Sequence, residues 1–208
     1  MGDPMRTALY VKTEYPLLKS MIKIDDYIAF AKQNNVSALT IADENLFGAM
    51  EFYTKCMQNN IKPILGLTIP YENHPVVLYA KNYQGYQNLL KLSTIHSERE
   101  ITLEDLQKYA NNLICILPVE SDQYYETFST FFPNVYQSFD HKETYDEHKV
   151  YMKETLYLTT EEKSYFYYLK AIRLGKLVTS LDKIETDSSY SDTFFTKANQ
   201  EILDACHF

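Results

Sequence analysis

Two stretches of the sequence, thirty residues apart, decide the expected fold: "ALYVKTEYPLLKS" (Ala8–Ser20) and "ALTIADENLFGAMEFY" (Ala38–Tyr53). In each, a short apolar run ends in polar residues, and apolar residues at helical spacing come next along the chain. This is the order of a strand, a loop and a helix. Two such units in succession predict parallel strands that are joined by outer helices.

The same alternation continues to the end of the chain. Strands are expected at residues 9–11, 36–42, 61–67, 75–80, 113–117, 134–139 and 155–158. Helices are expected at residues 24–33, 46–58, 83–96, 103–110, 123–131, 141–151, 160–177 and 197–206. About seven strands that alternate with helices favour a distorted, TIM-barrel-like (β/α)7 barrel with parallel strands over an open doubly wound sheet.

Composition sets the class of protein. The chain has 208 residues, of which 45% are hydrophobic, so it can bury the core of one domain. Its 28 acidic and 20 basic residues give a net charge of −8, so the chain as a whole lacks the positive field of a strong DNA binder. Cys56, Cys115 and Cys206 have no paired short spacing, which indicates reduced thiols in a cytoplasmic protein. No run approaches the ~18 apolar residues of a membrane span.

The chain divides into three parts in this interpretation. Residues 1–4, ahead of Met5, are typical of an expression-vector remnant. Residues 5–186 are expected to form the barrel. Residues 187–208 begin with polar, turn-forming residues and are expected to add a loop and a helix that lead out of it. The abrupt end on a helix suggests a piece of a longer protein.

Polar residues follow three consecutive predicted strands. Lys12 follows the first strand, Asp43 and Glu44 follow the second, and Thr68 follows the third. Because the carboxyl ends of parallel barrel strands share one face, these side chains should converge. Such a group can bind a metal, act as an acid and base, or neutralise its own charges. The ion-pair interpretation is favoured, since a lysine ammonium repels a cation and cannot ligate one.

Three further stretches carry a family resemblance: "NLFGAMEFY" (Asn45–Tyr53), "IKPILG" (Ile61–Gly66) and "AKNYQGYQNLLKLS" (Ala80–Ser93). With them, nearly the whole chain resembles the PHP (polymerase and histidinol phosphatase) domain at the N-terminus of bacterial DNA polymerase III alpha subunits. The resemblance implies the barrel fold that the alternating pattern also predicts.

The resemblance also implies that the metal site has degenerated. Metal-competent members carry His-x-His after the first strand, where this chain has Tyr10 and Lys12. The family's Thr-Asp-His-Gly-Asn motif is shortened to "ADEN" (Ala42–Asn45), and its later glutamate and Asp-x-His turn are missing. The vestigial metal positions are thus Tyr10, Lys12, Asp43, Glu44 and Thr68, with no catalytic residue and no metal expected in this chain. We expect Lys12 to form a salt bridge with Asp43, Glu44 or both, in place of a metal's charge.

The resemblance implies that the parent protein is a DNA-directed DNA polymerase of replication. This parent would use magnesium and bind primer-template DNA within the replisome. In it, this domain is expected to be a scaffold that docks on the palm and thumb of its own chain and offers a surface to a proofreading exonuclease subunit. The alternative is an active metal-dependent phosphoesterase, either a 3′–5′ proofreading exonuclease or a pyrophosphatase.

Other residue types receive structural interpretations. His74 is expected on the surface, His141 and His148 on one solvated helix face, and Cys206 with His207 outside any site. The aromatic run Tyr165–Tyr168 is expected to pack in a core or an interface rather than to stack on bases. The run Lys170–Lys176 is locally basic and could contact a neighbouring domain or a template strand.

Overall fold

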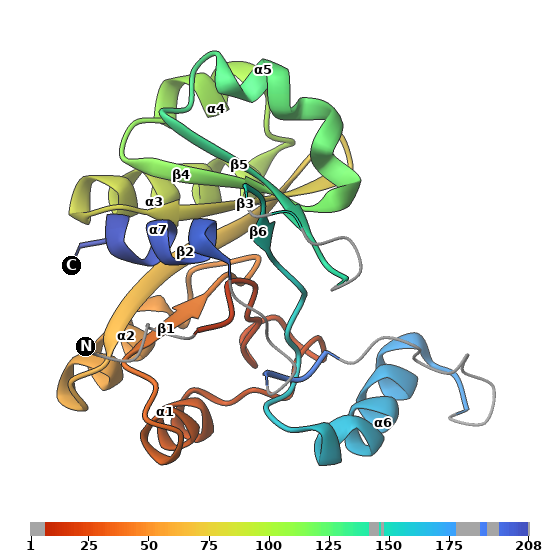
Figure 1. Ribbon diagram of the computed structural model, residues 1–208. Helices are drawn as coiled ribbons and strands as arrows, with labels where there is room; N and C mark the ends of the chain where they lie inside the picture. Colours follow the sequence, from red (N-terminus) through yellow and green to blue (C-terminus); the bar gives the residue numbers. More distant parts are fainter. Residues whose placement is uncertain (1–6, 142–145, 147, 178–187, 191–195, 208) are drawn as a thin grey trace.

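The computed structural model describes residues 7–141, 146, 148–177, 188–190 and 196–207, and shows a mixed α/β fold built on one curled sheet (Figure 1). The sheet is a half-barrel of six strands whose order in space follows the sequence. The strands are β1 (Ala38–Ile41), β2 (Lys62–Tyr71), β3 (His74–Ala80), β4 (Leu113–Leu117), β5 (Asn134–Phe139) and β6 (Val150–Tyr151).

Helices follow the expected order with small shifts at their ends. They are α1 (Ile24–Gln33), α2 (Ala49–Gln58), α3 (Tyr83–Glu98), α4 (Leu103–Tyr109), α5 (Tyr125–Ser129), α6 (Lys163–Leu174) and α7 (Lys197–Ala205), with 3₁₀ turns at Val119–Tyr124 and Thr160–Glu162. Asn35 and Asn60 end α1 and α2 in the left-handed conformation, with φ of 54° and 55°, which asparagine tolerates better than most residues. Among the described residues, no helix combines the length and the apolar character that crossing a membrane requires.

The prediction of uniformly parallel strands is wrong at β3. This strand runs antiparallel to both β2 and β4, whereas β1–β2, β4–β5 and β5–β6 are parallel pairs. The reason is the two-residue turn Glu72–Asn73, in which both residues have positive φ (47° and 66°). Such a turn reverses the chain into a hairpin and leaves no room for a crossover helix.

The helix expected at 141–151 is wrong where the chain is described, because Val150 and Tyr151 form β6 beside β5. Residues 142–145 and 147 of that segment lie outside the described residues. The strands expected at 9–11 and 155–158 appear only as the parallel bridges Val11–Thr155 and Tyr157–Ser189. The described residues therefore form a half-barrel rather than a complete seven-stranded barrel.

Helix α7 packs into the hollow of the half-barrel. Ala198, Ile202 and Leu203 on this helix lie in one buried cluster with Ile64 of β2 and Tyr79 of β3. The Asn199 side chain continues the sheet, since it accepts from the Tyr151 amide and donates to the Tyr151 carbonyl, both at 2.9 Å. The helix expected at 197–206 is thus part of the barrel core, and the expected boundary at residue 186 falls outside the described residues.

Gly66 marks a close contact within the sheet. A Cβ atom at this position would lie 2.5 Å from the ring of Tyr79 and 2.8 Å from the carbonyl oxygen of Ile41. Because the ring is fully buried and the carbonyl belongs to β1, moving either of them away would cost free energy. We expect Gly66→Ala to lower the free energy of unfolding by about 1–3 kcal/mol, which urea titration measures. Stability equal to that of the parent would contradict this contact.

Candidate functional site

Lys12 lies at the centre of the predicted site and is buried. Only 2% of its surface is exposed. Its Nζ donates to the carbonyl oxygen of Ala42 at 2.7 Å and to Oγ1 of Thr68 at 2.8 Å, and it lies 4.9 Å from the centre of the Tyr10 ring. The ammonium therefore joins the end of the first segment to Ala42, which follows β1, and to Thr68, which lies within β2 and not after it as expected.

Asp43 is equally buried and is held by a different residue. Its Oδ1 accepts from the Thr13 amide at 2.6 Å, and its Oδ2 accepts from the Thr13 hydroxyl at 2.5 Å. Burial raises the pKa of the Asp43 carboxyl, while the two Thr13 hydrogen bonds and the nearby Lys12 charge oppose that rise. Both carboxylate oxygens thus already have protein donors.

Glu44 forms an ion pair with Lys19 and not with Lys12. Neither Asp43 nor Glu44 forms an ion pair with Lys12, so the expected salt bridge is wrong. The physical reason is that each charged group has another partner at hydrogen-bond distance. The Lys12 ammonium donates to the Ala42 carbonyl and the Thr68 hydroxyl. Asp43 accepts from Thr13, and Glu44 accepts from Lys19. Lys12, Thr68 and the Tyr10 ring lie together, whereas Asp43 and Glu44 are bound by Thr13 and Lys19.

Burial and acidic neighbours compete at this site. Burial lowers the pKa of Lys12 to about 8, although Glu154, Glu44 and Asp43 favour its charged form. Desolvation by the surrounding cleft also raises the pKa of Glu154, although part of its side chain reaches solvent, and Lys12 opposes that rise. The pKa of the Tyr10 hydroxyl is raised well above its usual range by burial and by Glu154, so this phenol stays protonated.

The lowered pKa of Lys12 predicts that the stability of the fold depends on pH. Its value of about 8 in the folded chain lies below the ordinary 10.5, so the unfolded chain binds more protons in that interval. Stability therefore rises from about pH 8 to 10.5 through this group, by on the order of 3 kcal/mol in full. Urea titrations at pH 7 and pH 10 measure this contribution. At each pH, the free energy of unfolding of Lys12→Met is subtracted from that of the parent chain, and the two differences are compared. An unchanged difference would contradict the burial of a charged lysine.

A cleft of about 380 Å³ opens beside these residues. Tyr10 lines it, together with Glu120, Asp140, His141 and Glu154. His141 Nε2 lies 3.8 Å from Asp140 Oδ1. Lys153 also lines the cleft, so its charged lining combines three acids and one lysine beside the Tyr10 ring.

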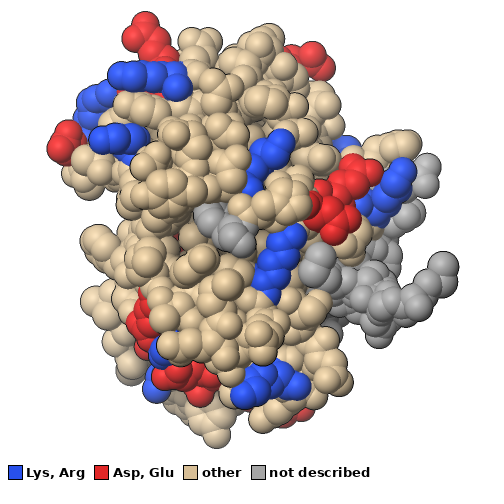
Figure 2. All heavy atoms as spheres, turned by 90° about the vertical axis from the view of Figure 1, so that its left-hand side faces the viewer, with Lys and Arg blue, Asp and Glu red and all other residues tan. Residues whose placement is uncertain are grey.

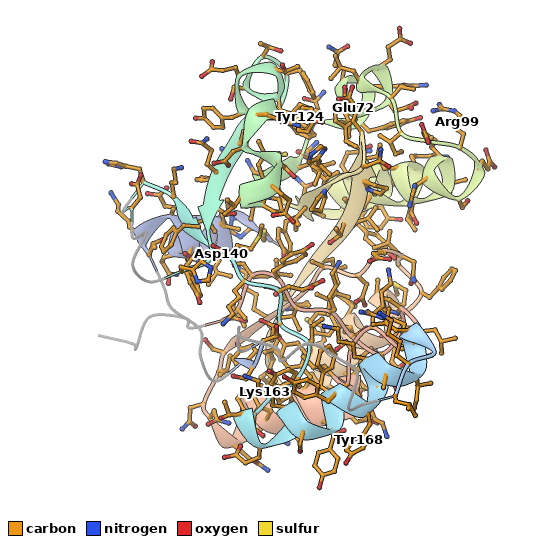
Figure 3. All side chains as sticks on the ribbon, turned by 90° about the vertical axis from the view of Figure 1, so that its right-hand side faces the viewer. Glu72, Arg99, Tyr124, Asp140, Lys163 and Tyr168 are labelled. Atoms are coloured by element: carbon orange, nitrogen blue, oxygen red, sulfur yellow. The ribbon has the colours of Figure 1, made fainter. Side chains whose placement is uncertain are left out.

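The remaining histidines and cysteines form no cluster of ligands. His74 is half-buried, and its Nδ1 lies 3.2 Å from the Tyr124 hydroxyl, which also donates to Glu72 (Figure 3). His148 is exposed, and burial raises the pKa of Cys206 to about 12. Within the described part of the chain, no group of three or more His, Cys, Asp or Glu residues could hold a metal ion.

Sequence reasoning missed three residues of the site: Thr13, Lys19 and Glu154. Thr13 carried no signal, because side chains alternate along a strand and the residue directly after an inward-facing Lys12 is expected to face the other way. Lys19 and Glu154 carried no signal, because each reaches the site from a loop whose path the sequence does not fix.

Comparison with known proteins gives one family model and several relatives. The PHP domain model matches residues 8–171. The DNA polymerase III subunit alpha of Staphylococcus aureus (strain Mu50) is 33% identical over 214 residues, which cover 94% of this chain and 19% of that protein. The subunit of the same name from Ureaplasma parvum is 40% identical over 99 residues, which cover 47% of this chain and 10% of that protein. The chain therefore spans about a fifth of the length of the Staphylococcus relatives.

Solved structures give a weaker likeness. A Bifidobacterium adolescentis protein, provisionally described as a metal-dependent phosphoesterase, aligns with a TM-score of 0.46 and 9% identity over 97% of this chain and 96% of its own. An amidohydrolase from Chromobacterium violaceum aligns with a TM-score of 0.42 and 8% identity over 82% of this chain and 84% of its own.

Proposed function

Because the chain belongs to the PHP domain family, with the match over residues 8–171, we propose that it is a metal-free structural member of that family. The observation that carries the proposal is the buried Lys12 ammonium, hydrogen-bonded to Ala42 and Thr68 among the vestigial metal positions. A cation at this place repels a metal ion, and lysine offers no lone pair while it is charged.

The other vestigial positions support the same proposal. Both oxygens of Asp43 accept hydrogen bonds from Thr13, and Glu44 is paired with Lys19. Tyr10 keeps its proton at neutral pH, and Thr68 donates to the Ala42 carbonyl at 2.6 Å. A divalent metal prefers several carboxylate or imidazole ligands. This set of donors does not fit such an ion.

The relatives support a proposal for the parent protein. We propose that the chain is the N-terminal region of a DNA polymerase III alpha subunit that synthesises DNA on a primed template with magnesium. Support comes from the 33% identity to the Staphylococcus aureus subunit over 94% of this chain. In that setting the domain would dock on the palm and thumb of its own chain and could present a surface to a proofreading exonuclease subunit.

A second candidate is an active phosphoesterase, as a 3′–5′ exonuclease or a pyrophosphatase. The observation in its favour is the cleft of about 380 Å³, which Glu120, Asp140, His141 and Glu154 line. Carboxylates and an imidazole around a cleft are groups that can bind metals and activate water. Under this alternative, the metals would bind at the cleft instead of at the vestigial positions, although no three of the described acids and histidines are grouped to hold an ion.

One assay separates the two candidates. The purified chain is incubated with manganese and either a labelled single-stranded oligonucleotide or pyrophosphate. We expect no hydrolysis above that of a buffer control, because the buried Lys12 ammonium and the hydrogen-bonded Asp43 do not hold the manganese ion that would activate water. Turnover that Glu154→Gln or Asp140→Asn abolishes would overturn the structural role. Both residues are only partly buried or exposed, so these variants should fold.

A further inference from the structure

Helix α6 has apolar residues on two opposite faces. On the inner face, Phe166 is buried, and its ring centre lies 5.4 Å from that of Tyr157. On the outer face, Tyr165, Tyr168 and Ile172 are 63%, 58% and 67% exposed. At 3.6 residues per turn, these three side chains lie within about 60° of one another around the helix, so they form one apolar row. Figure 1 places α6 at the outer edge of the molecule, and Figure 3 shows Tyr168 pointing away from the rest of it.

The expectation that Tyr165 and Tyr168 pack in a core is wrong, because only Phe166 of the run Tyr165–Tyr168 is buried. The other expectation, burial in an interface, stays a prediction. Single apolar side chains on a surface are common, whereas several in one contiguous row are typical of a contact surface. We name Tyr165, Tyr168 and Ile172 the α6 row.

The two ends of the α6 row carry opposite charges. Glu161 precedes Tyr165 by four residues, so it lies at the N-terminal end of the same side of the helix, and it is exposed. At the other end, the amide of Lys176 donates to the Ala171 carbonyl at 3.1 Å, which holds its backbone over the last turn, and its side chain is exposed. Among the described residues, neither Glu161 nor Lys176 forms an ion pair. An exposed acid thus bounds the row at one end and an exposed base at the other.

The row is also symmetric about the middle of the helix. Helix α6 spans Lys163–Leu174, so its midpoint lies between Tyr168 and Leu169. Tyr165 and Ile172 lie at equal distances of about 5 Å on either side of this point, at a rise of ~1.5 Å per residue. A surface with such internal symmetry matches itself when a second copy is turned by a two-fold axis through the midpoint.

An antiparallel pair of α6 helices uses every feature of this surface. The two-fold axis places Tyr165 of one copy on Ile172 of the other, and Glu161 of one copy beside Lys176 of the other, each contact occurring twice. The helix dipoles of the two copies also run in opposite directions. We propose that the α6 row is the contact surface of a homodimer of this chain. This inference goes beyond the structural role of the domain and does not depend on whether the barrel mouth holds metal.

A nucleic acid fits the row less well than a second copy. Lys163 and Lys170 lie on the side of α6 opposite the row. Arg173 lies about a quarter-turn from it, in the field of Glu154. These bases stand away from the two tyrosine rings, whereas a single-strand surface needs cations beside its stacking rings. The net charge of −8 does not prevent a dimer, because exposed charges farther apart than ~10 Å are largely screened at ~0.1 M salt.

Sedimentation equilibrium of the purified chain, from micromolar to millimolar concentration, measures the association. Two helices of this length bury less surface than the ~1,200 Å² at the low end of stable interfaces, so the dimer should be weak. We expect a dissociation constant on the order of 10⁻⁴–10⁻⁵ M. The weight-average mass should then rise with concentration from 24.4 kDa toward twice that value.

The apolar part of the contact is tested by Tyr165→Ser with Ile172→Ser, which should weaken association at least about tenfold. The matched control is Tyr83→Ser with Leu90→Ser on α3, because these side chains have the same spacing of seven residues and are 68% and 41% exposed. Figure 2 shows the side of the molecule around α3, where the Lys, Arg, Asp and Glu side chains are scattered. We expect the control to change association less than about twofold.

The charged ends test the antiparallel arrangement. Glu161→Lys and Lys176→Glu should each weaken association by about threefold to tenfold, because each variant places two pairs of like charges in contact. The double variant exchanges the two charges, so it should return association to within about twofold of the parent. Glu162, which accepts from the amides of Leu158 and Thr159, stays in place, so the start of the helix should remain folded.

Circular dichroism checks that each variant is folded. Rescue by the double charge exchange, together with a loss confined to the α6 variants, would support the homodimer. A mass that stays at the monomer value at every concentration would overturn it and favour another occupant of the α6 row, such as another part of the parent chain. Equal losses for the α6 and α3 variants, or single charge variants that the exchange does not rescue, would also overturn it.

Discussion

Replacing Lys12 by glutamate is expected to lower the free energy of unfolding by about 3–5 kcal/mol, because the variant buries an uncompensated negative charge. The position is only 2% exposed and lies in the field of Glu154, Glu44 and Asp43. In a chain of this size the thermal midpoint should fall by roughly 10 °C. Urea and thermal denaturation at pH 7, followed by circular dichroism, measure the loss.

The control for this prediction is Lys12→Met, which keeps the length of the side chain and removes the charge. It loses the hydrogen bonds to Ala42 and Thr68 but also removes the cost of burying an ammonium, which the lowered pKa of Lys12 indicates. We expect its stability at pH 7 to stay within about 1–2 kcal/mol of the parent. The defect of Lys12→Glu should shrink near pH 5, where the buried glutamate takes up a proton. Equal stability of the two variants at pH 7 would show that the charge at this position is unimportant.

The second large effect is expected for Asp43→Ala, with a loss of about 2–5 kcal/mol in the free energy of unfolding. The substitution leaves the amide and the hydroxyl of Thr13 without their acceptor. Thr13 is fully buried, so water cannot easily replace the carboxylate. Chemical denaturation measures the loss.

Glu44→Ala is the matched control, because it removes the next carboxylate along the chain. Glu44 and Lys19 each expose 40% of their side chains, and an exposed ion pair contributes less than about 1 kcal/mol. The two variants could instead lose the same stability. That result would mean that the hydrogen bonds from Thr13 to Asp43 do not stabilise the loop after the first segment.

The helices were largely predictable because their signals are local. Apolar spacing predicted α1 with its observed bounds, Ile24–Gln33, and the pairs Asn34–Asn35 and Asn59–Asn60 marked two helix ends. The antiparallel β3 was missed although its signal was present. Two β-rich runs are separated by only Glu72 and Asn73, which is the length of a tight hairpin. The alternation of strand and helix elsewhere outweighed that short turn.

The sequence predicted which residues lie at the site but not which partners they bind. Tyr10, Lys12 and Thr68 lie together, as the strand-end argument expected, although Thr68 lies within β2 and not after it. The bond from Lys12 to the Ala42 carbonyl depends on how the first segment lies beside β1, where the Ala42 amide donates to Val11. Sequence does not give this register, and side-chain charges suggested a salt bridge where a main-chain oxygen lies closer.

Metal binding by the purified chain tests the central claim most directly. Isothermal titration with manganese, zinc and magnesium, with metal analysis of the untreated protein, measures it without relying on any substrate. The account predicts no saturable binding at the barrel mouth and no metal above background, since Lys12 lies among the vestigial positions and Asp43 is already bound by Thr13. One or more ions bound per chain, with affinity that Glu154→Gln weakens, would contradict it.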